Sequence, residues 1–190
     1  GCDRVHKVTI VPRGRALGVT QLVPDEDRHN ISQRDIRSRL VMLLAGRAAE
    51  KIHFDEYSAG AENDLQEATK LARRMVTHWG MSERLGPVAF HTSEDHPFLG
   101  REMAHEHRHF SDHTAQLIDE EVAKILHTAE DRAKQTLSEH PDMLTTLAES
   151  LIQDEVLDED QIDQLIGPSV HQRADTDKVA EVNMTEPAKV

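Results

Sequence analysis

Residues Ser58–Leu65 read SAGAENDL in one-letter code and open a segment whose apolar residues recur at helical spacing as far as Trp79. The carboxylate of Asp64 falls in the first helical turn, and Gly80 is typical of a helix C-terminus. The pattern therefore predicts a helix over 61–79, in which Trp79 is expected to anchor the core. Carboxylates are common at helix starts because they complement the helix dipole. The spacing alone thus favours a structural role for Asp64.

Two strands are predicted upstream of this helix. Val5–Val11 alternates partly between apolar and polar residues, and Leu17–Val23 is rich in β-branched and apolar residues. The turn-forming residues at 12–15 separate the two runs. We therefore expect an antiparallel hairpin near the N-terminus.

A helix is predicted to follow the hairpin. Ser32 and Asp35 show the spacing of a capping box, with Asp in place of Glu. The apolar residues behind them fall on one helix face, namely Ile36, Leu40, Leu43 and Leu44. Gly46 lies inside this helix at a cost of about 1 kcal/mol relative to Ala. A close approach between helices would explain it.

The second half of the chain also reads as helical. A short strand is expected at 88–90, and a long helix should begin after Ser111. Pro141 permits a sharp start of the next helix, and we expect the helices on its two sides to pack antiparallel. A short last helix should be capped at Asp158 and end at Gly167. The predicted fold is mainly α, a domain over 1–167 with a small antiparallel β element near its N-terminus, followed by a disordered tail over 168–190.

Composition excludes several functions. The chain has 190 residues, a formal net charge of −13, and 30% charged residues. This charge disfavours binding to nucleic acid and contact with an anionic membrane surface. A single cysteine, Cys2, excludes an internal disulfide framework. No run of eighteen or more apolar residues is present, so no membrane span is expected.

Three motifs together closely resemble the proteolytic domain of the FtsH family of membrane-anchored, ATP-dependent zinc metalloproteases. They are the SAGAENDL stretch, the segment VHKVTIVPRGRALGVT at 5–20 and AGRAAE at 45–50. The resemblance extends over about residues 5–167. It implies a parent protein that hydrolyses unfolded or membrane proteins as a homo-hexamer driven by ATP. Such a parent lies at the cytoplasmic face of the bacterial inner membrane.

The resemblance also implies roles for particular residues. Asp64 would be a zinc ligand, and Gly18, Val19 and Thr20 would bind substrate backbone by strand addition. Glu50 would act behind the ligands or in an ion pair. The family's His-Glu-x-x-His helix precedes the VHKVTI strand, whereas this sequence begins at Gly1, and it contains no phosphate-binding G-x-x-x-x-G-K-[ST] motif. We therefore expect the zinc site of this chain to be incomplete and the chain by itself to be inactive.

A second zinc-protease signature occurs further along the chain. His105, Glu106 and His109 match His-Glu-x-x-His. Their neighbours are polar, and seven of the 13 histidines lie between His91 and His127, so a chance match is easy. A functional motif of this kind needs a buried helix beside the substrate. We interpret it as a solvated histidine cluster that could take up adventitious metal.

Two alternatives to a peptidase fragment remain open. The chain could be a non-catalytic assembly module that lost the zinc helix and kept the helical scaffold. It could also be an independent metalloprotease that uses His105, Glu106 and His109. The sequence directly upstream of Gly1 would distinguish the first alternative, and the zinc content of histidine variants would test the second.

Overall fold

The computed structural model describes residues 4–12, 18–23, 31–90 and 110–168. The chain divides into two units, which are described separately. The helical unit contains residues 30–139, and the sheet unit combines residues 3–29 with residues 140–190. Among the described residues, no helix is long and apolar enough to cross a bilayer.

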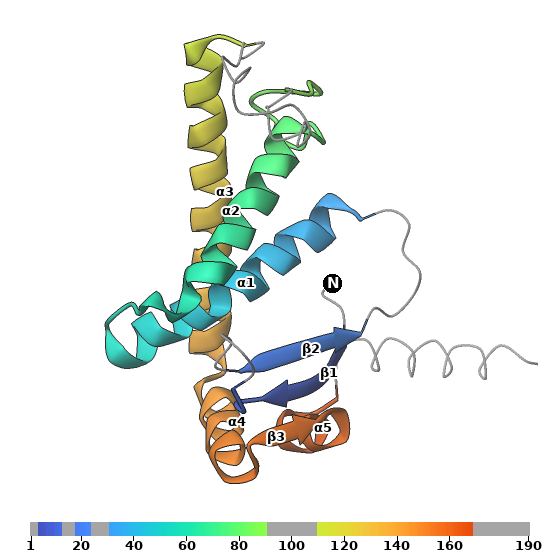
Figure 1. The fold of residues 1–190 in the computed structure, drawn as a ribbon, viewed down its shortest axis with the longest axis vertical. Coiled ribbons are helices and arrows are strands. Elements are labelled where there is room, and N and C mark those ends of the chain that lie inside the picture. The colour runs from blue at the N-terminus through green and yellow to red at the C-terminus, as the bar shows by residue number, and fades with distance from the viewer. Residues whose placement is uncertain (1–3, 13–17, 24–30, 91–109, 169–190) are drawn as a thin grey trace, which may run out of the picture. The chain divides into compact units, whose positions relative to one another are not determined.

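The helical unit is built from three long helices and one short turn of helix (Figure 1). These elements are α1 (Gln33–Phe54), the 3₁₀ turn η1 (Ala59–Ala61), α2 (Glu62–Thr77) and α3 (Asp112–Glu139). All three long helices contact one another. Their facing sides form one hydrophobic core, which includes Ile36, Leu40 and Leu44 of α1, Ala68, Ala72, Met75 and Val76 of α2, and Ile118, Val122 and Ala129 of α3. The predicted apolar stripes therefore form the core of this unit.

The predicted helix ends are confirmed by their hydrogen bonds. Ser32 and Asp35 form the reciprocal capping box at the start of α1. The hydroxyl of Ser111 accepts a hydrogen bond from the amide of Thr114 at 3.2 Å, which caps α3. Gly80 after α2 has a φ of +58°, where a side chain would be strained. The following amide, that of Met81, donates back to the carbonyl of Met75 at 2.9 Å.

The sheet unit joins the two ends of the described chain. Strands β1 (Arg4–Thr9) and β2 (Val19–Val23) form the predicted antiparallel hairpin, with Val8 paired to Thr20. The third strand, β3 (Val156–Asp158), pairs antiparallel with the other edge of β1, so the order is β2-β1-β3. Helices α4 (Pro141–Asp154) and α5 (Glu159–Ile166) complete the unit. The predicted fold class, mainly α with a small antiparallel sheet, is confirmed.

One predicted strand is wrong, and one observed strand was not predicted. Residues 88–90 form no strand, and β3 was not anticipated. The antiparallel packing of the helices on the two sides of Pro141 stays a prediction, because the two helices belong to different units. Within the sheet unit, α4 contacts α5 and β3. No residue of α4 is fully buried. The predicted tail beyond Gly167 lies outside the described residues, apart from Pro168.

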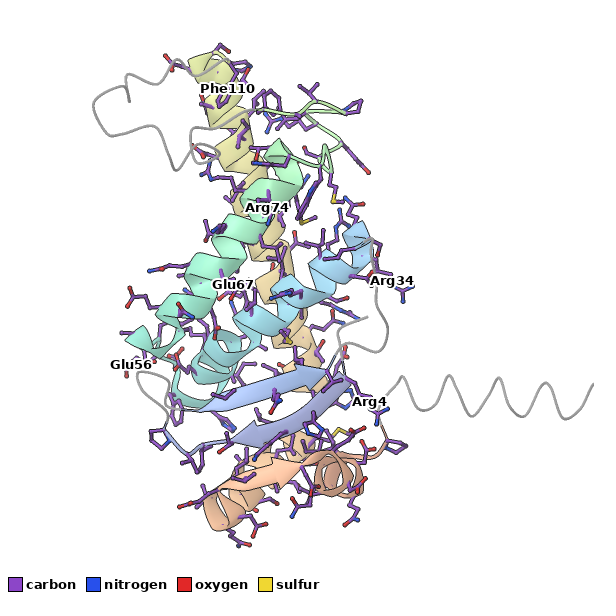
Figure 2. The ribbon with its side chains drawn as sticks, turned by 45° about the vertical axis from the view of Figure 1, so that its right-hand side comes forward. Arg4, Arg34, Glu56, Glu67, Arg74 and Phe110 are labelled. Atoms are coloured by element: carbon purple, nitrogen blue, oxygen red, sulfur yellow. The ribbon has the colours of Figure 1, made fainter. Side chains whose placement is uncertain are left out.

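Two predictions about single residues are also corrected. Gly46 does not mark a close helix approach, because an added Cβ there would meet nothing within 4 Å. Trp79 was expected to anchor the core, yet it is 38% exposed. Its ring lies 4.8 Å from the guanidinium carbon of Arg74, which Figure 2 labels on α2. The indole therefore packs under a surface cation instead of entering the core.

Candidate functional site

Asp64 lies where the sequence predicts, in the first turn of α2 directly after η1. Its side chain is exposed, and it makes no hydrogen bond or ion pair with any other residue that the structure describes. Some loss of hydration at the helix start raises the pKa of the Asp64 carboxyl, and the negative charge of Glu67 adds to this rise. Glu67 is labelled on the same helix in Figure 2. A bound cation would offset both effects, because it favours the charged carboxylate.

The loop before Asp64 is held by Glu50 of α1. One carboxylate oxygen of Glu50 accepts a hydrogen bond from the Ser58 hydroxyl at 2.6 Å, and the other accepts from the Ser58 amide at 3.0 Å. These two bonds lower the pKa of Glu50. The Ser58 hydroxyl in turn accepts from the Gly60 amide at 3.1 Å, inside η1. Glu50 thus acts as a hydrogen-bond acceptor that fixes the entry to α2.

Ser58 is a site residue that the sequence reasoning did not single out. A serine in front of a helix is a recognised N-cap signal, and Ser58 does cap η1. Its link to Glu50 spans eight positions of chain. No periodic pattern connects residues across such a loop, so only the folded structure identifies the pair.

Asp64 is the one residue of the helical unit to which the family resemblance assigns a zinc-ligand role. Catalytic zinc is usually held by three protein ligands and keeps one position open for water. In the described residues no group of three or more His, Cys, Asp and Glu side chains is placed to hold a metal ion. The exposed, unpartnered oxygens of Asp64 suit one such ligand position. The described part of the chain therefore fits a zinc ion only together with ligands from elsewhere.

The predicted substrate-binding residues belong to the sheet unit. Val19 and Thr20 begin β2, which is an edge strand, and Gly18 directly precedes it. A Cβ at Gly18 would lie 2.7 Å from the carbonyl oxygen of Thr9 on the neighbouring strand. Only glycine permits this backbone approach. An edge strand presents unpaired amides and carbonyls to which an extended peptide can bind.

Other candidate features lie away from Asp64 or cannot be placed. His105, Glu106 and His109 lie outside the described residues. A groove of about 540 Å³ runs along the first half of α1 and the end of α3. Arg34, Arg37 and Arg132 contribute to its lining, over an apolar floor that includes Val41 and Met42. None of the predicted site residues lines this groove.

Comparison with known proteins gives a consistent result. Residues 1–165 match the profile of Peptidase family M41. The chain is 57% identical over 173 residues to ATP-dependent zinc metalloprotease FtsH 1 of Rhodopirellula baltica, covering 91% of this chain and 26% of the relative. It is 47% identical to the FtsH protease of Syntrophotalea carbinolica, and the match covers 87% of this chain and 26% of the relative. It is 48% identical to the FtsH protease of Haemophilus influenzae, and the match covers 86% of this chain and 26% of the relative. The chain thus spans about a quarter of the length of these curated relatives.

Proposed function

Because the chain belongs to Peptidase family M41, we propose that it is part of the proteolytic domain of an FtsH-like, ATP-dependent zinc metalloendopeptidase. Asp64 then supplies the carboxylate ligand, and the two imidazole ligands come from the family's His-Glu-x-x-His helix outside this sequence. The observation that carries the proposal is the state of Asp64. It is an exposed carboxylate without a partner among the described residues, presented on a helix start that Glu50 and Ser58 fix.

The proposed chemistry is divided between the zinc ion and the residues of this chain. A zinc ion in such a site lowers the pKa of its bound water to about 7 and polarises the peptide carbonyl. The part of this chain is to hold a carboxylate oxygen in a fixed direction and to bind the substrate. Glu50 and Ser58 fix the direction of the carboxylate by holding the loop before Asp64. The edge of β2 binds the substrate through main-chain hydrogen bonds at Gly18, Val19 and Thr20. Such bonds suit substrates of any sequence.

The proposal extends to the parent protein. Its substrates are unfolded or membrane proteins, and ATP hydrolysis in a separate domain drives their delivery. The parent assembles as a homo-hexamer and is anchored in the bacterial inner membrane with its peptidase domain on the cytoplasmic side. Sedimentation of the longer protein tests the hexamer. The alternative of a non-catalytic assembly module is not favoured, because the similar relatives are all metalloproteases by name.

The experiment compares Asp64→Asn with wild type in a longer protein that carries this chain together with the His-Glu-x-x-His segment. Zinc affinity is measured by competition with a chelator, and hydrolysis of casein is followed in parallel. We expect zinc binding to weaken by at least about 10-fold, since loss of even an outer partner of a metal ligand costs about 10- to 100-fold. The matched control is Glu67→Gln on the same helix. Equal zinc affinity of Asp64→Asn and Glu67→Gln would refute the proposal.

A further inference from the structure

Arg47 of α1 connects two parts of the helical unit. Its guanidinium carbon lies 3.7 Å from the centre of the Tyr57 ring, in the loop between α1 and η1. The same guanidinium forms an ion pair with Glu130 of α3. The Arg47 side chain is 27% exposed and that of Glu130 is 13% exposed. A pair shielded to this degree is far less weakened by solvent than an exposed ion pair.

Both loop residues next to this contact are held to the same face of α1. Tyr57 stacks on Arg47, and the next residue, Ser58, is bound by Glu50. Residues three positions apart on a helix are neighbours on its surface, as Arg47 and Glu50 are. Glu130 of α3 forms an ion pair with the same guanidinium. Helix α1, helix α3 and the loop that contains Tyr57 are therefore tied together shortly before the helix turn that carries Asp64.

We propose that Arg47 is a positioning residue for Asp64. By joining Glu130 of α3 to Tyr57, it holds the loop over 55–61 in place and so sets the direction in which the Asp64 carboxylate faces the metal. This inference rests on the proposed function, in which Asp64 binds zinc. The geometry requires arginine, because a planar guanidinium can stack on a ring and pair with a carboxylate at once, whereas the ammonium of lysine is a compact point charge.

The test uses the longer protein described above and two readouts. One is zinc affinity by chelator competition, and the other is hydrogen exchange of the Ser58 and Gly60 amides. We expect Arg47→Met and Tyr57→Ala to weaken zinc binding by about 10-fold, the effect of losing an outer support of a metal ligand, and to speed exchange at both amides. Tyr57→Phe keeps the ring and should retain wild-type values.

The matched control is Arg39→Met, on the same helix. Arg39 forms an ion pair with Glu67 of α2 in which both side chains are more than half exposed. This variant should change neither readout. If Arg47→Met fails to fold, Tyr57→Ala decides the matter, because it leaves the pair of Arg47 and Glu130 intact.

The outcomes separate this inference from the proposed function. Wild-type zinc affinity in Arg47→Met and Tyr57→Ala, together with weakened binding in Asp64→Asn, would overturn the positioning role alone. Unchanged binding in Asp64→Asn would overturn the proposed function, and the positioning role with it. Faster exchange at Ser58 and Gly60 with weaker zinc binding, rescued in Tyr57→Phe, is the result that supports Arg47.

Discussion

Two glycines of similar appearance in the sequence have opposite surroundings. A Cβ at Gly46 would meet nothing within 4 Å inside α1, whereas one at Gly18 would lie 2.7 Å from the Thr9 carbonyl oxygen. We predict that Gly46→Ala raises the free energy of unfolding by about 0.5–1 kcal/mol, the helix penalty of glycine. Gly18→Ala should lower it by about 1–3 kcal/mol, because the backbone must shift. Urea unfolding of both variants checks this, and a loss of stability in Gly46→Ala would contradict it.

The capping box of α1 should make stability depend on acid. The hydrogen bond from the Ser32 hydroxyl holds the pKa of Asp35 at about 2, below its ordinary value of 3.8. A lowered folded-state pKa stabilises the fold above pH 3.8, and that contribution is lost as the pH falls toward about 2. Asp35→Asn should therefore show a smaller loss of stability over this range than wild type.

The measurement is the free energy of unfolding at several pH values between 3.8 and about 2. Ser32→Ala is the control, since it removes the hydroxyl that binds the carboxylate. Ser32→Ala should flatten the curve less than Asp35→Asn, because the Ser32 amide still donates to the Asp35 carboxylate at 3.3 Å. The double variant should match Asp35→Asn. Parallel curves for wild type and Asp35→Asn would show that the capping box is not the acid-sensitive contact.

At the scale of residues, helix ends were predictable and side-chain environments were not. Ser32, Asp35 and Gly80 act locally, so their roles can be read from a few neighbours. The position of Asp64 followed for the same reason. The exposure of Trp79 depends on whether another element covers it, and no local pattern contains that information. The pairing of Glu50 with Ser58 was not predicted for the same reason, because no local pattern connects the two residues.

At the scale of elements, the edge strand β2 carries the predicted substrate contact. Neighbouring residues in a strand point their amides to opposite sides, so only one of Val19 and Thr20 faces away from β1. We introduce Val19→Pro and Thr20→Pro singly in the longer protein. The proline that removes the outer amide should leave the hairpin folded. It should raise the KM for an unfolded protein substrate while zinc affinity stays unchanged.

The other proline removes an amide that is bonded within the hairpin and should destabilise it, which provides an internal control. Circular dichroism and urea unfolding identify which variant is which. If the folded variant hydrolyses the substrate with the wild-type KM, strand addition at Gly18, Val19 and Thr20 is wrong.

The long helices were predicted because their apolar stripes extend over several turns. Strand β3 was missed since three residues, Val156–Asp158, are too few for a periodic pattern. Its formation depends on β1, which lies more than a hundred residues earlier in the chain. There Val8 of β1 pairs with Leu157 of β3. The packing of α4 against α5 and β3 was not predicted, because contacts between separate elements leave no local pattern in the sequence. Tertiary contacts of this kind are set by the whole chain.

At the scale of the whole molecule, we predict that the 190-residue chain alone shows no zinc-dependent proteolysis. Among the residues that the structure describes, no three His, Cys, Asp or Glu side chains are placed to hold a metal ion, whereas a catalytic site needs three protein ligands. Casein is incubated with the chain and added zinc, with and without a chelator. Chelator-sensitive cleavage that is lost in Glu106→Ala would instead assign the activity to His105, Glu106 and His109.

The function of the molecule was inferred from motif resemblance and not from physical pattern. A metal site collects ligands from segments that are distant in sequence, so the spacing around Asp64 could not distinguish a ligand from a helix-start carboxylate. The family match now supports the first interpretation. The structure shows which residues hold the loop before Asp64, namely Glu50, Ser58 and Arg47.

The most direct test is the position of zinc itself. Crystals of the longer protein, carrying this chain and the His-Glu-x-x-His segment, are measured at the zinc absorption edge to give an anomalous difference map. We predict a single strong peak about 2.0–2.2 Å from a carboxylate oxygen of Asp64, the usual distance for such a ligand. A zinc peak beside His105 and His109, with none at Asp64, would contradict the account.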